Sequence, residues 1–185
     1  MQFINLANKD DSQLIKDVIM HPLKVNKDES GILVEVLKTN WPDIYGSGRE
    51  FAMQYYSITP PGLARDEDVW HFHPTVQEDR MGLIQGEVII AIADTREDSE
   101  TKNVVNLFNI KAQDNPYLLL IPKKTLHGFL VTSKEPAILI NFPTALYNPE
   151  EEGRVSFKEA DIKLPDGTPF SWNLVRKALS EKNEV

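Results

Sequence analysis

The sequence contains no cysteine among its 185 residues. Disulfides, thiolate metal sites and cysteine nucleophiles are therefore excluded, and any chemistry must use oxygen and nitrogen groups. The sequence also lacks an apolar run near the ~20 residues that span a bilayer, and its first residues lack the layout of a secretory signal. These absences predict a cytoplasmic protein with no membrane partner.

Basic residues are neither abundant nor clustered. Lys and Arg number 20 against 28 Asp and Glu, which gives a net charge of -8 and a pI near 5.0. Nucleic acids bind clustered cations, so they are not an expected partner, and a small molecule is the expected ligand. The chain is 41% hydrophobic and 26% charged, as in ordinary globular proteins, so we expect one domain over residues 1–185.

Short strand-like segments rich in Val, Ile, Leu and Tyr follow one another, separated by turns that contain Pro and Gly. The clearest helix signal lies in the tail, at about residues 171–183, where Ser171 can cap an amphipathic segment. This pattern predicts an all-β jelly-roll barrel with its core at about residues 20–165 and a short C-terminal helix. We expect strands at residues 31–37, 51–58, 69–73, 80–84, 87–93, 104–110, 117–121, 127–131 and 137–141.

Three of the four histidines lie in two of these predicted strands. Because alternate residues of a strand face one side, His71 and His73 point the same way. The same alternation puts Asp79 on the more apolar face of its strand and Glu78 on the other face. His127 also shares the apolar face of its strand. If these faces line the interior, three imidazoles and a carboxylate converge.

Trp70 and Phe72 lie on the opposite face of the strand that carries His71. The alternation alone therefore leaves open whether the aromatic side or the histidine side faces the core. A homodimer interface over Trp70 and Phe72 would allow both sides to be buried.

Several short motifs, in their order and spacing, resemble the dTDP-4-dehydrorhamnose 3,5-epimerase family of cupins over roughly residues 20–165. The resemblance implies a cupin jelly roll, a homodimer with strand exchange, and a sugar epimerase that requires no cofactor. It places His71 at the family's general base and His127 at its second active-site histidine. The motifs are ESGILVE at 29–35, MQYYS at 53–57, Gly86-Glu87 followed by DTREDSET at 94–101, IP and HGF within 121–129, and YNPEEEG at 147–153.

The implied chemistry is proton transfer beside a ketone, in an epimerase or a keto-isomerase that acts on a keto-sugar. Such a C–H bond is acidified because its conjugate base is an enolate, so epimerisation needs a base, a donor to the oxyanion, and an acid on the opposite sugar face. We expect His71 as the base, which suits an imidazole near neutral pH, His127 as the electrophilic partner, and Tyr147 as the acid. The expected substrate-binding residues are His73, Gln54, Glu35, Asn141 and Arg80.

Several positions depart from the family pattern. Asp68, His73 and Asp79 stand where the family has arginine, glutamine and lysine, and Ser30 replaces another arginine. The family's acid tyrosine falls on Asn141, and its base-orienting aspartate falls near Phe157. Loss of these cations should weaken the binding of a sugar-nucleotide diphosphate.

Two other functions therefore remain open. The first is a metal-dependent cupin that binds Zn, Ni, Fe or Mn through imidazoles and one carboxylate. Its ligands would be His71, His73, His127 and Asp79, with Glu78 as the alternative carboxylate. The second is a non-catalytic carbohydrate-binding protein, suggested by the missing tyrosine and aspartate.

Overall fold

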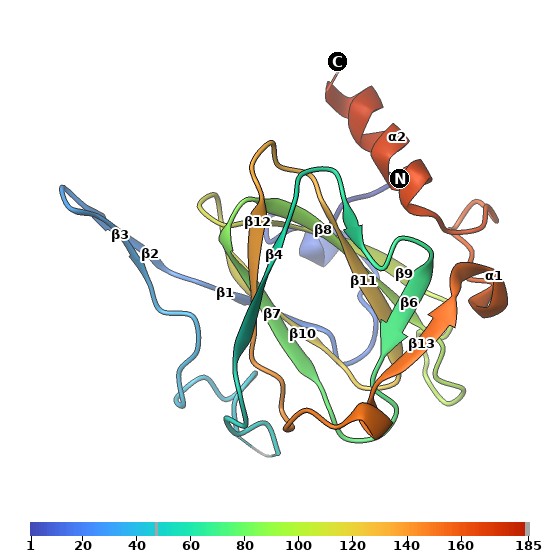
Figure 1. Ribbon diagram of the computed structural model, residues 1–185, viewed down its shortest axis with the longest axis horizontal. Coiled ribbons are helices and arrows are strands. Elements are labelled where there is room, and N and C mark those ends of the chain that lie inside the picture. Colours follow the sequence, from blue (N-terminus) through green and yellow to red (C-terminus); the bar gives the residue numbers. More distant parts are fainter. Residues whose placement is uncertain (47, 184–185) are drawn as a thin grey trace.

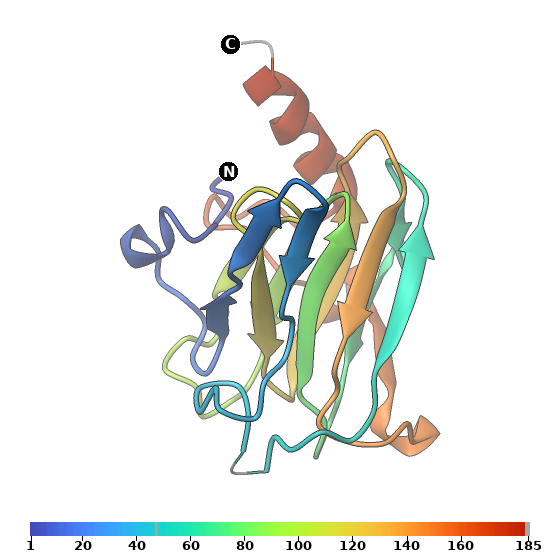
Figure 2. The same cartoon turned by 90° about the vertical axis from the view of Figure 1, so that its left-hand side faces the viewer.

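The computed structural model describes residues 1–46 and 48–183. Two antiparallel sheets face each other (Figure 1). The five-stranded sheet, seen in front in Figure 2, has the order β1 (Ile19–Pro22), β10 (Tyr117–Ile121), β7 (Asp79–Gln85), β12 (Ala137–Asn141) and β4 (Tyr55–Thr59). The six-stranded sheet has the order β13 (Gly153–Ser156), β6 (Val69–Phe72), β11 (Thr125–Val131), β8 (Glu87–Asp94) and β9 (Val105–Lys111), with β5 (Ala64–Arg65) beside β11.

Four short helices and a hairpin complete the described chain. The hairpin pairs β2 (Val25–Asp28) with β3 (Gly31–Val34) and projects from the body of the molecule (Figure 1). The helices are η1 (Lys9–Asp11), η2 (Pro149–Glu151), α1 (Phe157–Ala160) and α2 (Trp172–Asn183). No helix of residues 1–46 or 48–183 is both long and apolar enough to span a bilayer.

The main core lies between the two sheets and follows from strand alternation. On β8, Val88, Ile90 and Ile92 pack into this core, whereas Ile89 and Ala91 pack into a second core on the outer face of the sheet. A strand that is apolar on both sides is expected where both faces of its sheet are covered. Each fully buried aliphatic side chain contributes about 1.5–3 kcal/mol of transfer free energy.

The C-terminal segment covers the outer face of the six-stranded sheet. Trp70 is fully buried there, with its ring 5.1 Å from that of Phe157 and 4.5 Å from that of Phe170. Val175 of α2 belongs to the same core. The aromatic face of β6 is therefore covered within one chain, and its packing does not depend on the dimer interface that the sequence suggested there. Both sides of the strand are enclosed, and the histidine side faces the interior.

Buried Arg80 ties an outer loop to the five-stranded sheet. Its side chain is fully buried and donates hydrogen bonds to the carbonyl oxygens of Ile44, Arg49, Glu50 and Phe142 at 2.5–3.2 Å. These bonds satisfy the loop carbonyls that burial would otherwise leave unpaired. Ile44, Arg49 and Glu50 are thereby fixed next to the strand that carries Asp79.

A buried carboxylate organises the DTREDSET segment. Asp94 accepts hydrogen bonds from Arg96, Ser99 and Thr101, and Thr101 Oγ1 in turn accepts from the N–H of Lys16 at 2.9 Å. Burial alone would raise the pKa of Asp94, but these hydrogen bonds hold it well below its usual range. The segment therefore holds the N-terminal region against the six-stranded sheet.

The predicted strands occur, with differences at their ends. Two of them, 117–121 and 137–141, have the predicted bounds, whereas the strand predicted at 31–37 ends at Val34 and the one predicted at 51–58 starts at Tyr55. The helix predicted at about 171–183 is present as α2, and Ser171 Oγ accepts from the N–H of Leu174 at 3.4 Å. The list of expected strands lacks β1, β2, β5 and β13, and helix α1 was not expected; none of these is longer than four residues.

Candidate active site

The three imidazoles come together on the inner side of the six-stranded sheet. His71 on β6 pairs directly across from His127 on β11, and His73 follows the end of β6. The ring centroids lie 4.8 Å apart for His71 and His73, 5.2 Å for His71 and His127, and 5.7 Å for His73 and His127. The two-residue period of the strands predicted that His71 and His73 lie on one side, and it left open whether that side faces the interior.

Asp79 approaches these rings from the facing sheet. Its side chain is 1% exposed, and its Oδ2 lies 3.1 Å from His73 Nε2 and 3.4 Å from His127 Nε2. Gln77 Nε2 donates to Oδ1 at 3.0 Å. Glu78 faces away and forms an ion pair with Arg49 at 2.6 Å. The argument from strand alternation, which put Asp79 on the inner face and Glu78 on the other face, was therefore correct.

The buried carboxylate of Asp79 gives His73 a different protonation state from the other two histidines. Burial would raise the pKa of Asp79, but the hydrogen bond from His73 and the nearby imidazole charges hold it well below its usual range. Burial opposes the charged form of His73, yet the hydrogen bond and charge of Asp79 outweigh it and raise the pKa of that imidazole. Asp79 and His73 therefore form a buried ion pair.

The other two imidazoles are neutral. Burial lowers the pKa of His127 to about 4. Burial, followed by the charge of His73, also lowers the pKa of His71 below its ordinary value. His127 Nε2 makes no hydrogen bond with any residue of the described ranges. A neutral imidazole can accept a proton, so His71 is in the protonation state that a general base needs.

Glu152 lies behind His71, and the sequence analysis did not assign it to the site. Its Oε1 lies 3.8 Å from His71 Nδ1 and 2.9 Å from Arg154 Nη2. Gly153 follows on β13, directly across from Phe72, and a Cβ at that position would overlap the ring. Glycine therefore allows β13 to approach β6 closely enough to bring Glu152 to His71.

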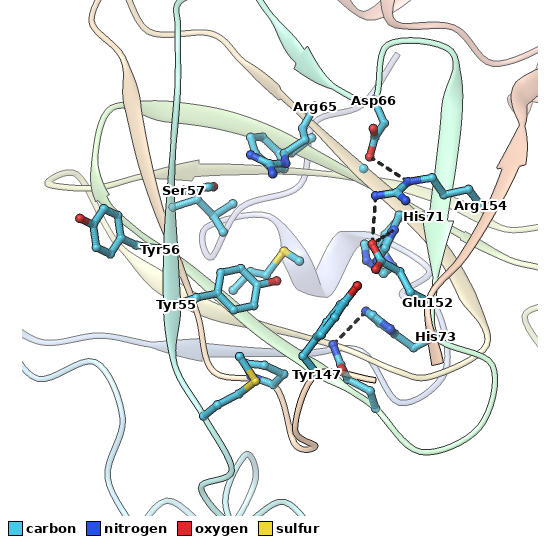
Figure 3. A pocket seen from close by; sticks show the side chains of 18 of the residues that line it. Tyr55, Tyr56, Ser57, Arg65, Asp66, His71, His73, Tyr147, Glu152 and Arg154 are labelled. Atoms are coloured by element: carbon cyan, nitrogen blue, oxygen red, sulfur yellow. Dashed lines mark hydrogen bonds and ion pairs between the residues drawn. The ribbon is translucent and has the colours of Figure 1, made fainter. Parts of the chain in front are cut away.

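A pocket of about 390 Å³ opens between the two sheets in front of the histidines. Figure 3 shows the side chains of Tyr55 and Tyr147 pointing toward the histidines, with Arg65 and Arg154 at the edge of the group. Met81, Phe129 and Leu139 of the inner core are among its lining residues. The sequence analysis missed several lining residues: Met53, Tyr55, Tyr56, Ser57, Arg65, Asp66, Gln77, Asn148, Glu152 and Arg154.

Four predicted substrate-binding residues do not line this pocket. Arg80 points to the opposite side of β7, where all its bonds to protein go to loop carbonyls. Gln54 is exposed just before β4, and Glu35 is exposed after β3, with Lys38 Nζ 3.1 Å from its carboxylate. Asn141 is fully buried behind Asp79 rather than in the pocket wall.

The two remaining predicted residues lie at the pocket. Tyr147 belongs to its lining and is 67% exposed. His73 also lines it, with its Nδ1 2.8 Å from the carbonyl oxygen of Glu151. Phe157, near the position of the family's base-orienting aspartate, packs instead against Trp70 on the outer face of β6. Glu152 is the carboxylate that neighbours the base.

The histidine cluster also has the spacing of a metal site. One nitrogen atom from each of His71, His73 and His127 can be chosen so that all three lie within 4.8 Å of one another. Imidazole nitrogens at about 2.0–2.1 Å suit Zn²⁺, and the unpaired Nε2 of His127 could serve as one ligand. An ion there would occupy the lone pair that His71 needs as a base.

Comparison with known proteins identifies the family. The sequence profile described as dTDP-4-dehydrorhamnose 3,5-epimerase matches residues 12–184. The chain belongs to this family. The epimerase is 40% identical over 141 residues to a probable low-salt glycan biosynthesis epimerase of Haloferax volcanii, a match that covers 75% of the chain and 86% of the relative.

Other relatives agree. A spore coat polysaccharide biosynthesis protein of Bacillus subtilis is 30% identical over 162 residues, covering 86% of the chain and 97% of that protein. A dTDP sugar isomerase structure from Desulfovibrio desulfuricans superposes with a TM-score of 0.72 at 22% identity, covering 86% of the chain and 92% of that structure. A dTDP-4-dehydrorhamnose 3,5-epimerase structure from Elizabethkingia anophelis gives 0.65 at 26%, covering 84% and 86%.

These matches confirm the predicted cupin jelly roll with a short C-terminal helix. They also confirm the predicted function class, a sugar epimerase or isomerase. The metal-dependent and non-catalytic alternatives are not favoured by this family membership.

Proposed function

We propose that the protein epimerises a nucleotide-linked keto-sugar and that His71 removes the proton beside the ketone. The observation that supports this role is a neutral imidazole in the pocket with a carboxylate behind it. When His71 becomes protonated, Glu152 stabilises the imidazolium through its negative charge. The family pattern gives this role to an aspartate near position 157, and we propose that Glu152, just before β13, takes it here.

The electron pair released at carbon moves to the ketone oxygen, which must then be stabilised. We propose two groups for this purpose. His73, kept protonated by Asp79, supplies the positive charge that the family obtains from a lysine at position 79. Neutral His127 acts as the second donor from the same side of the pocket, in the tautomer that carries its one proton on the unpaired Nε2, since a neutral imidazole can polarise a carbonyl.

Two arginines support a substrate that carries a diphosphate. Arg65 and Arg154 line the pocket, and Arg65 forms no ion pair within the described part of the chain. Arginine binds phosphate through paired, charge-assisted hydrogen bonds. We propose that these two side chains bind the diphosphate in place of the arginine lost at Asp68.

Solvent exchange tests the role of His71. The protein is incubated in heavy water with dTDP-, UDP- and GDP-linked 4-keto-6-deoxy sugars, and deuterium at the carbons beside the ketone is followed by NMR. We expect incorporation by the wild-type protein and a loss of 10²–10⁴-fold in His71→Asn. His21→Gln is the matched control, because His21 bonds Asp43 at 2.7 Å away from the pocket. No exchange with any sugar, or full exchange in His71→Asn, would refute the proposal.

We further propose that the protein is a homodimer and acts in the cytoplasm. Support for the dimer comes from β4, an edge strand on which Tyr56 is 62% and Ile58 60% exposed, and from the projecting hairpin, where Leu33 is 62% exposed. Apolar edges of this kind are unusual on a monomer. A monomeric mass in solution would contradict the dimer, and recovery in a membrane or secreted fraction would contradict the location.

A further inference from the structure

Three tyrosines line the pocket, and Figure 3 shows that Tyr55 and Tyr147 point toward the histidines whereas Tyr56 points away. The surroundings of Tyr55 and Tyr147 differ. Tyr55 lies on β4, directly across from Asn141 on β12, in the sheet opposite the one that carries His71. Tyr147 lies on the loop before η2, is 67% exposed, and its hydroxyl makes no hydrogen bond with any residue of the described ranges. Only the hydroxyl of Tyr55 is held in place by the protein.

Asn141 fixes the direction in which the Tyr55 hydroxyl can donate. The backbone N–H of Arg80 donates to Asn141 Oδ1 at 3.0 Å, so the amide oxygen is identified and the other atom is Nδ2. Asn141 Nδ2 donates one hydrogen to Asp79 Oδ1 and the other to the hydroxyl oxygen of Tyr55, each at 2.8 Å. Because the phenol oxygen accepts here, its own proton remains available to the pocket.

We propose that Tyr55, oriented by Asn141, is the proton donor on the sugar face opposite His71. This inference rests on the proposed function, in which His71 is the base. The sequence pattern put the family's acid tyrosine at position 141, and here the phenol comes from the paired position on the neighbouring strand. Tyr55 therefore replaces Tyr147 as the acid expected from the sequence.

The step balances without a further reactant. His71 takes the proton from carbon, and the C–H electron pair forms the enolate. The enolate carbon then takes the proton of the Tyr55 hydroxyl from the other face, which re-forms the ketone and leaves a phenolate. His71 releases its proton to solvent and Tyr55 regains one, so one stereocentre is inverted with no net change of protons.

The chemical state of Tyr55 agrees with this role. Tyr55 is 41% exposed as a whole residue, but burial of its hydroxyl end, followed by the charge of Asp79, raises its pKa to about 12. The group therefore keeps its proton until a strongly basic carbon is generated beside it. A base on one sheet and a donor on the other is also the geometry that inversion requires.

The test separates inversion from exchange. Tyr55→Phe and Tyr147→Phe are incubated in heavy water with whichever keto-sugar the wild-type protein accepts, and NMR follows both deuterium uptake and the inverted product. For Tyr55→Phe we expect inversion to fall by 10²-fold or more, while exchange with retention stays within about threefold, because His71 can still remove and return a proton. Tyr147→Phe should invert at a rate within about threefold of the wild-type protein.

Inversion at the wild-type rate in Tyr55→Phe, or the inversion defect in Tyr147→Phe instead, would overturn the proposal. Loss of both exchange and inversion in folded Tyr55→Phe would also overturn it, because the residue would then serve binding or proton removal. Absence of exchange in the wild-type protein would instead refute the base role of His71. Circular dichroism and Tm verify folding, and Asn141→Leu, which removes the hydrogen bond to the phenol, should show the same split between exchange and inversion.

Discussion

Replacement of Asp79 by Asn tests the buried ion pair at the centre of the site. The side chains of Asp79 and His73 are 1% and 9% exposed, and their polar atoms lie 3.1 Å apart. Removing one partner of a buried pair costs roughly 3–5 kcal/mol, because the other charge is left unpaired. An asparagine keeps the shape and can still accept from Asn141, so we expect the lower end of this range, about 3 kcal/mol.

The penalty should depend on pH. The lowered pKa of Asp79 gives stability that is present above its unfolded value of about 3.9 and is lost as the pH falls through the folded pKa. The raised pKa of His73 gives stability that is full below about 6.5 and is lost as the pH rises through its folded pKa. The ion pair therefore stabilises the protein most between roughly pH 4 and 6.5.

Urea denaturation at pH 5.5 and at pH 9 measures this difference. For Asp79→Asn we expect a loss of about 3 kcal/mol at pH 5.5 and a clearly smaller loss at pH 9. Glu78→Gln is the matched control, because this neighbouring carboxylate pairs with Arg49 nearer the surface and should cost about 1 kcal/mol or less. An equal loss for Asp79→Asn at both pH values would refute the charged His73.

Three further outcomes are expected. The acid limb of kcat/KM should have its midpoint below pH 6.5, because the lowered pKa of His71 keeps the base neutral; a midpoint above 7 in a pH profile would contradict this. Arg80→Lys should lower Tm by several degrees, since one ammonium does not reach four carbonyls, and leave KM unchanged; a raised KM without a Tm change would restore Arg80 to the substrate site. Zn²⁺ should inhibit by binding His71, His73 and His127, and EDTA should restore rather than abolish turnover; metal analysis and activity of chelated protein distinguish these outcomes.

The two-residue period of strands predicts much of the site. It placed His71 and His73 on one side, and it placed Asp79 rather than Glu78 inside. It did not decide which side of β6 is buried, because that depends on the C-terminal segment that packs over Trp70 about a hundred residues later in the chain. Both faces of the strand are covered, one by the apolar C-terminal segment and the other by the histidine cluster, which a single alternation pattern does not predict.

Residues missed by the sequence analysis depend on contacts between distant segments. Tyr55 and Asn141 are 86 positions apart and meet only through the register of β4 and β12. Glu152 lies in an acidic run that resembles a solvated loop, and only the pairing of β13 with β6 brings it to His71. The YNPEEEG motif was the one available signal for it. Arg80 was misassigned because its charge suggested a phosphate ligand, whereas the folded loop supplies carbonyls.

Met81, Phe129 and Leu139 belong both to the inner core and to the pocket lining. The floor on which the sugar ring would rest is therefore the same apolar layer that holds the sheets together. A change of volume in this layer would shift the width of the gap between the two walls, so that thermal stability and stereochemical selectivity would vary together. Substitutions meant to change the selectivity of this protein should therefore start with the apolar residues beneath the substrate rather than with the polar groups around it.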